Sequence, residues 1–138
     1  MKIYPFIEDF CHKSVVKDNY EDRLLNLCHA LDHADYVVIG AGAGLSTAAG
    51  IAYSGKRFTD NFADFIERYS LTDMYSSAFY PFNTEEERWA YWARHILMNR
   101  YDIPGTDLYR MLFKVVKEKD YFVITTNVDG QFEKSGFE

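Results

Sequence analysis

Two short segments of this sequence contain residue types and spacings that could support chemistry. Residues 40–51 read GAGAGLSTAAGI, and a glycine-rich turn of this kind can place backbone amides against a pyrophosphate group. Residues 124–132 read ITTNVDGQF, which puts a carboxamide and a carboxylate just beyond the end of an apolar strand. Two such elements in this order predict a nucleotide site with chemistry at the sugar.

The glycine segment does not match the GxGxxG fingerprint of ordinary dinucleotide oxidoreductases. Counted from Gly40, the third glycine position holds Leu45, and counted from Gly42 it holds Thr47. An oxidoreductase is therefore disfavoured. A tight turn that simply leads into a packed helix is the alternative interpretation of this segment.

Strands and helices must alternate to position these two segments. Residues 36–39 form a short apolar run typical of a buried strand, and residues 43–49 should open a helix after the glycine turn. Residues 121–126 predict a second strand, and residues 56–120 between the strands are largely helical. A strand, a glycine turn and a helix begin a doubly wound nucleotide fold. We therefore predict an α/β fold, a partial Rossmann-like parallel sheet with a helical lobe inserted between the two motif strands.

Further helices are expected before the first strand and within the lobe. Residues 19–34 carry leucines at helical spacing. Aromatic and aliphatic side chains recur at helical spacing early in the lobe: Phe58, Phe62, Phe65, Ile66 and Tyr69. Thr84 begins a capping box, and Thr106 could cap a later helix. Trp89 and Trp92 have the spacing of core residues, which we favour over a place beside a ligand pocket.

Composition narrows the class of protein. A chain of 138 residues is the size of one domain, and its net charge of −6 argues against binding to nucleic acid or to an anionic membrane. The sequence has no apolar run of membrane-spanning length and no signal-peptide pattern. Cys11 and Cys28 are far apart, so we expect free thiols and a cytoplasmic protein. His29 and His33 lack a third convergent ligand, so we predict no metal site.

Taken together, the two segments resemble the sirtuin (Sir2) family. Its members typically carry GAGxSxxxGIP and, after a helical lobe, TQNxD at a strand end. This chain has GAGLSTAAGI at residues 42–51 and TTNVD at residues 125–129, with Thr126 in place of the glutamine. The resemblance extends from Asn19 onward, but it covers only the N-terminal half of a full family domain.

The resemblance implies NAD as co-substrate, with cleavage of the bond between nicotinamide and ribose. Asn127 and Asp129 would be catalytic, Asn127 by orienting the ribose hydroxyls or a water and Asp129 by hydrogen bonding to nicotinamide or ribose. The implied cofactor-binding residues are Gly42, Ala43, Gly44, Ser46, Gly50, Tyr53, Arg57, Thr126, Asn127 and Asp129. An Asx-turn after the strand is the alternative, purely structural explanation of Asn127 and Asp129.

Departures from the typical family pattern point to a subgroup. Typical sirtuins continue with PDFR, whereas residues 52–58 of this chain read AYSGKRF, which makes Tyr53, Arg57 and Phe58 the candidates for the cofactor loop. The combination more closely resembles the macrodomain-linked bacterial sirtuins. That subgroup is associated with protein ADP-ribosylation, including that of lipoyl-carrying acceptor proteins, more than with deacylation.

The sequence up to Glu138 contains only part of what the family uses. The general-base histidine, the zinc module and the adenosine-binding motifs follow TQNxD in typical sirtuins, so residues 1–138 are expected to be a truncated NAD-binding domain with weak NAD affinity and negligible turnover. Whether this chain is itself an enzyme stays open. An NAD glycohydrolase and a noncatalytic fragment that forms homo-oligomers through exposed sheet edges are the alternatives.

Overall fold

The computed structural model describes residues 19–138, and the chain divides between Asp35 and Tyr36 into two compact units. The described part of the first unit is helix α2 (Tyr20–His33), as the leucine spacing predicted. Asn19 caps this helix, because its Oδ1 accepts a hydrogen bond of 2.9 Å from the backbone nitrogen of Asp22. Cys28 is an exposed free thiol, whereas Cys11 lies outside the described residues.

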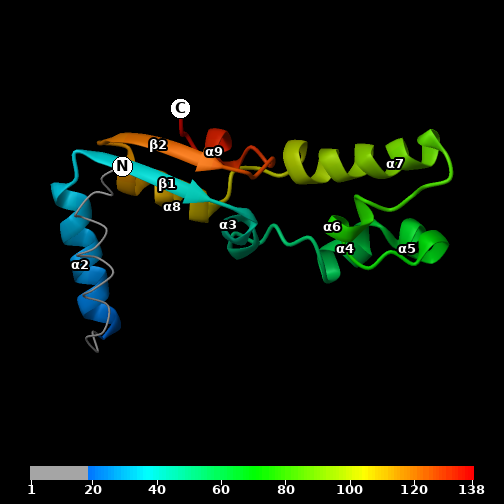
Figure 1. The fold of residues 1–138 in the computed structure, drawn as a ribbon, viewed down its shortest axis with the longest axis horizontal. Coiled ribbons are helices and arrows are strands. Elements are labelled where there is room, and N and C mark those ends of the chain that lie inside the picture. The colour runs from blue at the N-terminus through cyan, green and yellow to red at the C-terminus, as the bar shows by residue number, and fades with distance from the viewer. Residues whose placement is uncertain (1–18) are drawn as a thin grey trace, which may run out of the picture. The chain divides into compact units, whose positions relative to one another are not determined.

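The second unit contains a parallel pair of strands, β1 (Tyr36–Ala41) and β2 (Asp120–Thr125). The register runs from Tyr36 opposite Asp120 to Ala41 opposite Thr125, so both strands end at the same edge (Figure 1). All described elements between the strands are helical. The predicted fold class is confirmed: a small parallel sheet of the Rossmann type with a helical lobe between its strands.

The two faces of this sheet have different environments. Its inner face packs against α3 (Ala43–Ala48), α8 (Asp107–Val116) and the segment that contains α9 (Gln131–Lys134). Four large apolar side chains on the other face are 59–75% exposed: Tyr36, Val38, Phe122 and Ile124. Alternation of side chains along a strand therefore gives one face to the core and leaves the other uncovered by the described elements of the second unit.

Short helices build the lobe, namely α4 (Lys56–Asn61), α5 (Ala63–Tyr69), α6 (Met74–Ser77), α7 (Glu85–Ile96) and the π-helical turn η2 (Leu97–Tyr101). The predicted aromatic run is divided between α4 and α5, because Phe62 at φ −127° leaves the helical conformation. The three phenylalanines of the run, Phe58, Phe62 and Phe65, still converge on one core, and Ile66 and Tyr69 pack against it. The other buried members of this core are Leu71, Met74 and Tyr91.

Two expectations for the lobe and α8 are confirmed and two are wrong. Thr84 caps α7, since its Oγ1 accepts a 3.2 Å hydrogen bond from the nitrogen of Glu87. Helix α8 begins directly after Thr106, but the Thr106 side chain makes no capping hydrogen bond. Trp92 packs on the lobe core as expected, whereas Trp89 is 57% exposed.

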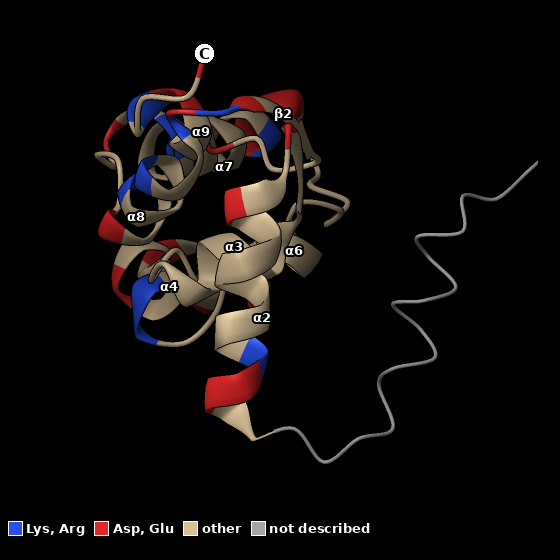
Figure 2. Ribbon diagram, turned by 90° about the vertical axis from the view of Figure 1, so that its left-hand side faces the viewer, with Lys and Arg blue, Asp and Glu red and all other residues tan. Residues whose placement is uncertain are grey.

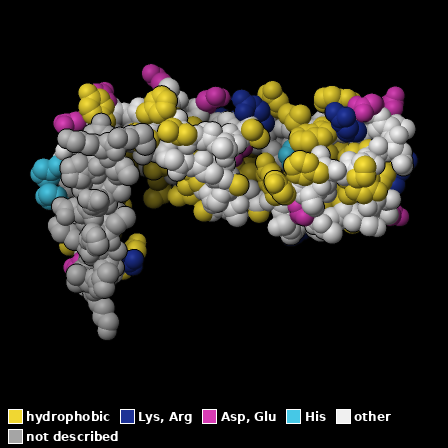
Figure 3. Space-filling model, in the orientation of Figure 1, with side chains coloured by type: hydrophobic (Ala, Val, Ile, Leu, Met, Phe, Trp, Pro, Cys, Tyr) yellow, Lys and Arg dark blue, Asp and Glu magenta, His cyan; other side chains and the backbone are white. Residues whose placement is uncertain are grey.

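Trp89 instead borders a groove of about 560 Å³ on the lobe surface, whose lining includes Phe79, Pro81 and Trp92. Hydrophobic side chains are visible on the surface of this lobe in Figure 3. Basic and acidic positions are interspersed along the described helices (Figure 2). None of the helices described between residues 19 and 138 is long and apolar enough to cross a membrane.

Candidate functional site

The two sequence motifs meet where the parallel strands end. The glycine turn follows β1 directly and the TTNVD segment overlaps the end of β2, while Ala41 and Thr125 are register partners. In open α/β sheets, ligands bind outside the carboxyl ends of the strands. The fold therefore brings the two segments to the place where this architecture binds ligands.

A buried hydroxyl and a buried carboxylate join the two motifs. Ser46, on α3, donates a hydrogen bond of 2.6 Å from Oγ to Oδ2 of Asp129. Both residues are only 5% exposed. A short, charge-assisted hydrogen bond in such a shielded place is strong and fixes the position of both partners.

Asn127 binds to the glycine turn through its side-chain nitrogen. Its Nδ2 lies 2.9 Å from the carbonyl oxygen of Gly42 and 3.1 Å from Oγ of Ser46. Because a carbonyl oxygen can only accept, the amide nitrogen must face Gly42, and the orientation of the carboxamide is settled by chemistry. The Asn127 Oδ1 is therefore the atom that can accept a hydrogen bond from a ligand hydroxyl.

Asp129 also makes the local turn that was weighed against a functional role. Its Oδ1 accepts a 3.0 Å hydrogen bond from the nitrogen of Gln131, which is an Asx-turn. The structural alternative is thus correct for this one bond. The contacts of Asp129 and Asn127 with α3 are additional, because they connect residues more than 80 positions apart.

The glycine turn leaves its backbone open to a ligand. Gly42, Ala43 and Gly44 are exposed, and a Cβ added at either glycine would meet no atom within 4 Å. Gly50 lies after α3 with a φ of +89°, a conformation that glycine adopts readily. Thr126 is exposed beyond the end of β2, so the residue in the place of the family glutamine lies at the surface.

Arg57 binds protein groups on both sides of its guanidinium. Its Nη1 donates to the carbonyl oxygen of Ala52 at 3.1 Å and to Oδ1 of Asn99 at 2.7 Å, and its Nη2 donates to the carbonyl oxygen of Met98 at 3.0 Å. These bonds tie the segment after α3 to the π-helical turn η2. In this structure Arg57 therefore holds the loop together instead of reaching out from it.

Tyr53 lies on the same loop, and the pKa of its hydroxyl is affected by a residue of the second motif. Burial raises the pKa of the Tyr53 hydroxyl, the Asp129 carboxylate raises it further, and Arg57 opposes the shift. The Tyr53 ring also packs edge-on against His95, with 5.5 Å between the ring centroids. Both burial and the Asp129 carboxylate therefore favour the neutral form of the Tyr53 hydroxyl.

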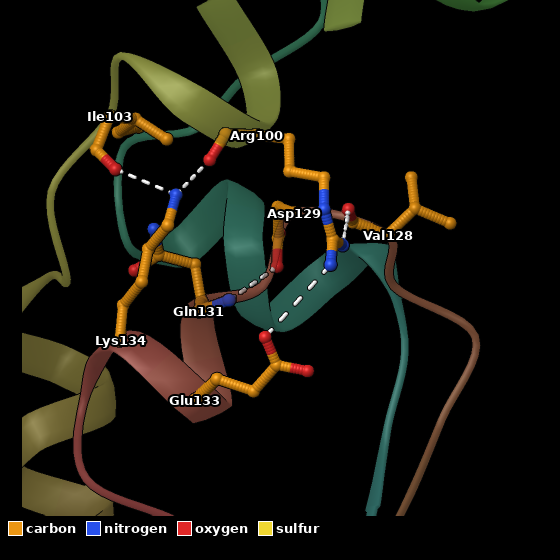
Figure 4. A network of polar contacts seen from close by, with 7 residues as sticks. All are labelled: Arg100, Ile103, Val128, Asp129, Gln131, Glu133 and Lys134. Atoms are coloured by element: carbon orange, nitrogen blue, oxygen red, sulfur yellow. Dashed lines mark hydrogen bonds and ion pairs between the residues drawn. The ribbon is translucent and has the colours of Figure 1, made fainter.

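A network around η2 fixes the loop that carries Asn127 and Asp129 (Figure 4). Arg100 donates to the carbonyl oxygen of Val128 at 2.6 Å, and its guanidinium lies 3.9 Å from Glu133. Lys134 in turn donates to the backbone carbonyls of Arg100 and Ile103. The carbonyl between the two motif residues is therefore held from the lobe side.

Sequence reasoning missed two further residues at the site. Gln131 is fully buried and joins the β2 loop to the start of α8, donating to the oxygen of Pro104 at 3.0 Å and accepting from the nitrogen of Thr106 at 2.9 Å. Tyr109, on α8, places its hydroxyl 2.8 Å from Ser46 Oγ. In the sequence, the polar residue Gln131 next to Phe132 was only a weak indication of a buried hydrogen-bonding role. Tyr109 gave no such indication, because its spacing is that of a core residue.

This chain is similar to proteins whose names refer to ADP-ribosyl transfer. A stretch of 125 residues, 91% of the chain, is 42% identical to a protein ADP-ribosyltransferase of Staphylococcus aureus (strain Mu50) and covers 40% of that protein. A stretch of 111 residues, 78% of the chain, is 36% identical to a probable bifunctional ADP-ribose hydrolase/ADP-ribosyltransferase of Fusarium oxysporum f. sp. cubense and covers 18% of it. The chain thus spans less than half the length of either relative. No family model matches it.

Proposed function

We propose that this chain is the motif-bearing part of a sirtuin-like, NAD-dependent protein ADP-ribosyltransferase. The observation that carries the proposal is the hydrogen-bonded cluster of Ser46, Asn127 and Asp129, which unites the two motifs beside an open glycine turn. Support also comes from the names of the two relatives, since both refer to ADP-ribosyl transfer. Residues 1–138 would form one partial NAD-binding domain, with residues 56–120 as the helical insertion between its two strands.

The glycine turn and the hydrogen-bonded cluster would bind different parts of NAD. The backbone amides of the exposed residues 42–44 would bind the diphosphate. These amides would supply the local attraction for an anion that a chain with a net charge of −6 does not provide through its overall charge. The Oδ1 of Asn127 would accept a hydrogen bond from a ribose hydroxyl. The buried Asp129 would act through its charge and by holding Ser46 in place.

In the proposed reaction the bond between the ribose carbon and the nicotinamide nitrogen breaks, and its electron pair leaves with nicotinamide. Positive charge develops at the ribose carbon, where a nearby carboxylate is favourable. A nucleophile of the acceptor then bonds to that carbon and loses its proton. We infer that the acceptor is a protein. The likeness to the macrodomain-linked subgroup favours ADP-ribosylation over deacylation, and it favours a lipoyl-carrying protein as the acceptor.

Calorimetric titration of NAD and ADP-ribose into the chain tests this proposal. Asn127→Ala should raise the Kd of both ligands by about 3- to 10-fold, which corresponds to one lost hydrogen bond. Asn83→Ala, at an exposed loop position, is the matched control and should leave both values unchanged. Equal affinity in the parent and in Asn127→Ala would contradict the proposed role of the cluster.

Transfer and hydrolysis are distinguished by the fate of ADP-ribose. With NAD and a lipoylated carrier protein, a full-length homologous form that carries both motifs should increase the mass of the carrier by one ADP-ribosyl group. An NAD glycohydrolase would release nicotinamide and free ADP-ribose without an acceptor. Nicotinamide release that is independent of the carrier protein would therefore favour the NAD glycohydrolase over the transferase as the function.

A noncatalytic assembly role is the second candidate, and the exposed apolar face of the sheet favours it. Each strand also has an edge that no other described strand pairs with. Such surfaces recruit strands or helices of other chains. A stable homo-oligomer with no affinity for NAD or ADP-ribose would support this candidate.

A further inference from the structure

Tyr109 lies at the centre of the polar cluster, although it belongs to neither motif. It is fully buried on α8, and its ring packs edge-on against Phe132 with 5.0 Å between the centroids. Its hydroxyl is 2.8 Å from Ser46 Oγ and 3.2 Å from Asn127 Nδ2. A tyrosine buried only for its ring would not need to place its oxygen between these two side chains.

The proton positions in the cluster follow from the donor and acceptor capacities. An ionised carboxylate only accepts, so Ser46 gives its single proton to Asp129 over 2.6 Å. Ser46 then has no proton left for Tyr109, and Tyr109 must donate to Ser46. The hydroxyls thus form a directed chain from Tyr109 through Ser46 to Asp129.

This direction determines what the Tyr109 oxygen can do next. With its proton committed to Ser46, the oxygen can only accept, and the neighbouring donor is Nδ2 of Asn127 at 3.2 Å. The Asn127 nitrogen therefore faces three acceptors, which are the Gly42 carbonyl, Ser46 and Tyr109. All three favour the orientation that turns Oδ1 of Asn127 away from the cluster.

We propose that Tyr109 is a positioning residue that fixes the carboxamide of Asn127 through its hydroxyl group. The consequence for ligand affinity rests on the proposed function, whereas the effect on Asn127 itself does not. Tyr109→Phe removes one acceptor from Asn127 and one donor from Ser46, and it keeps the ring that packs on Phe132. The change is therefore confined to the hydrogen bonds.

The test combines the spectrum of Asn127 with ligand affinity in Tyr109→Phe. The side-chain amide signals of Asn127, assigned in ¹⁵N-labelled protein by their loss in Asn127→Ala, should shift or broaden. The Kd for ADP-ribose should rise by about 3- to 10-fold. In the double variant with Asn127→Ala, Tyr109→Phe should add almost nothing, since the two residues act through one contact.

Tyr121→Phe is the matched control. Tyr121 also lies in the core beneath the sheet, but its hydroxyl accepts from the backbone nitrogen of Glu138 at 3.1 Å. It should leave the Asn127 signals unchanged. Unchanged Asn127 signals in Tyr109→Phe, or effects on affinity that simply add, would overturn the positioning role. Shifted signals in a chain that binds no ligand would keep that role and reject the proposed function.

Discussion

The helical lobe and the sheet half of the second unit differ in how completely they bury their apolar side chains. The lobe closes its core with its own aromatic side chains, and Phe62 contacts Phe58, Phe65 and Tyr91 at ring-centroid distances between 5.2 and 6.2 Å. The sheet half packs one face on α8 and leaves the other exposed. The lobe is therefore a packed scaffold, whereas the sheet half has surface that remains to be covered.

The candidate site combines contributions from both halves. The site lies in the sheet half, where Ser46, Asn127 and Asp129 are held mainly by hydrogen bonds. The lobe contributes fixed points from η2, since Asn99 binds Arg57 and the next residue, Arg100, binds the carbonyl of Val128. The packed lobe thus helps to hold the hydrogen-bonded residues at the carboxyl ends of the strands. Substitutions in the lobe core and in the sheet half therefore test different contributions.

Phe62→Ala should have the largest effect, because it removes a fully buried ring from the centre of the lobe core. Large-to-small changes of this kind typically cost about 3–5 kcal/mol. Urea unfolding followed by tryptophan fluorescence measures the loss, since both tryptophans lie on α7. Phe79→Ala, at a side chain that is 74% exposed, should change the free energy of unfolding by less than about 0.5 kcal/mol. Similar losses in both variants would refute the packed lobe.

Gly105→Ala should destabilise the sheet half by about 1–3 kcal/mol, the usual cost of overpacking. A Cβ at Gly105 would lie 2.5 Å from the backbone oxygen of Lys134, and backbone cannot rotate away. The matched control is Gly40→Ala in β1, where an added Cβ would meet nothing within 4 Å. Differential scanning calorimetry should show a lower Tm for the first variant only. An unchanged Tm would mean that the α8 and α9 segments are not closely joined there.

The sequence predicted the strands, the glycine turn and most helices, because these depend on local patterns. Apolar runs before Gly40 and before Thr126, and the Thr84 cap, are readable without tertiary information. The π-helical turn η2 was not readable, since residues 97–101 continue a helical pattern. Exposure of Trp89 was also missed, because helical spacing does not say how far a core extends.

For the site, the sequence supplied the motif residues but not their connections. Asn127 and Asp129 were recognisable from their place after a strand, and Ser46 from the glycine segment. Tyr109 was not, since it is 63 positions from Ser46 and looks like any core aromatic residue. Contacts of this kind depend on how α8 packs under the sheet, and no local pattern encodes that packing.

His95 should make the lobe sensitive to acid. Burial lowers the pKa of His95 below its ordinary value of 6.5, and Arg57 lowers it further. The unfolded chain therefore binds a proton more readily than the folded chain, so stability is complete above pH 6.5 and falls as the pH drops towards the folded-state pKa. Urea unfolding at pH 7.5 and 5.5 should show this loss, and His95→Gln should reduce it. His33→Gln, on the surface of α2, should leave it unchanged.

The smallest effect on stability is expected on the open face of the sheet. Phe122 is 66% exposed, and threonine is also a good strand former, so Phe122→Thr should change the free energy of unfolding by less than about 0.5 kcal/mol. Val123→Thr is the matched control, because Val123 packs on the core beneath the sheet and its replacement should destabilise the fold. If the open face mediates association, sedimentation velocity should show concentration-dependent oligomers in the parent and fewer in Phe122→Thr. Equal association in both proteins would place the contact elsewhere, and the exposed face would then be only an uncovered surface.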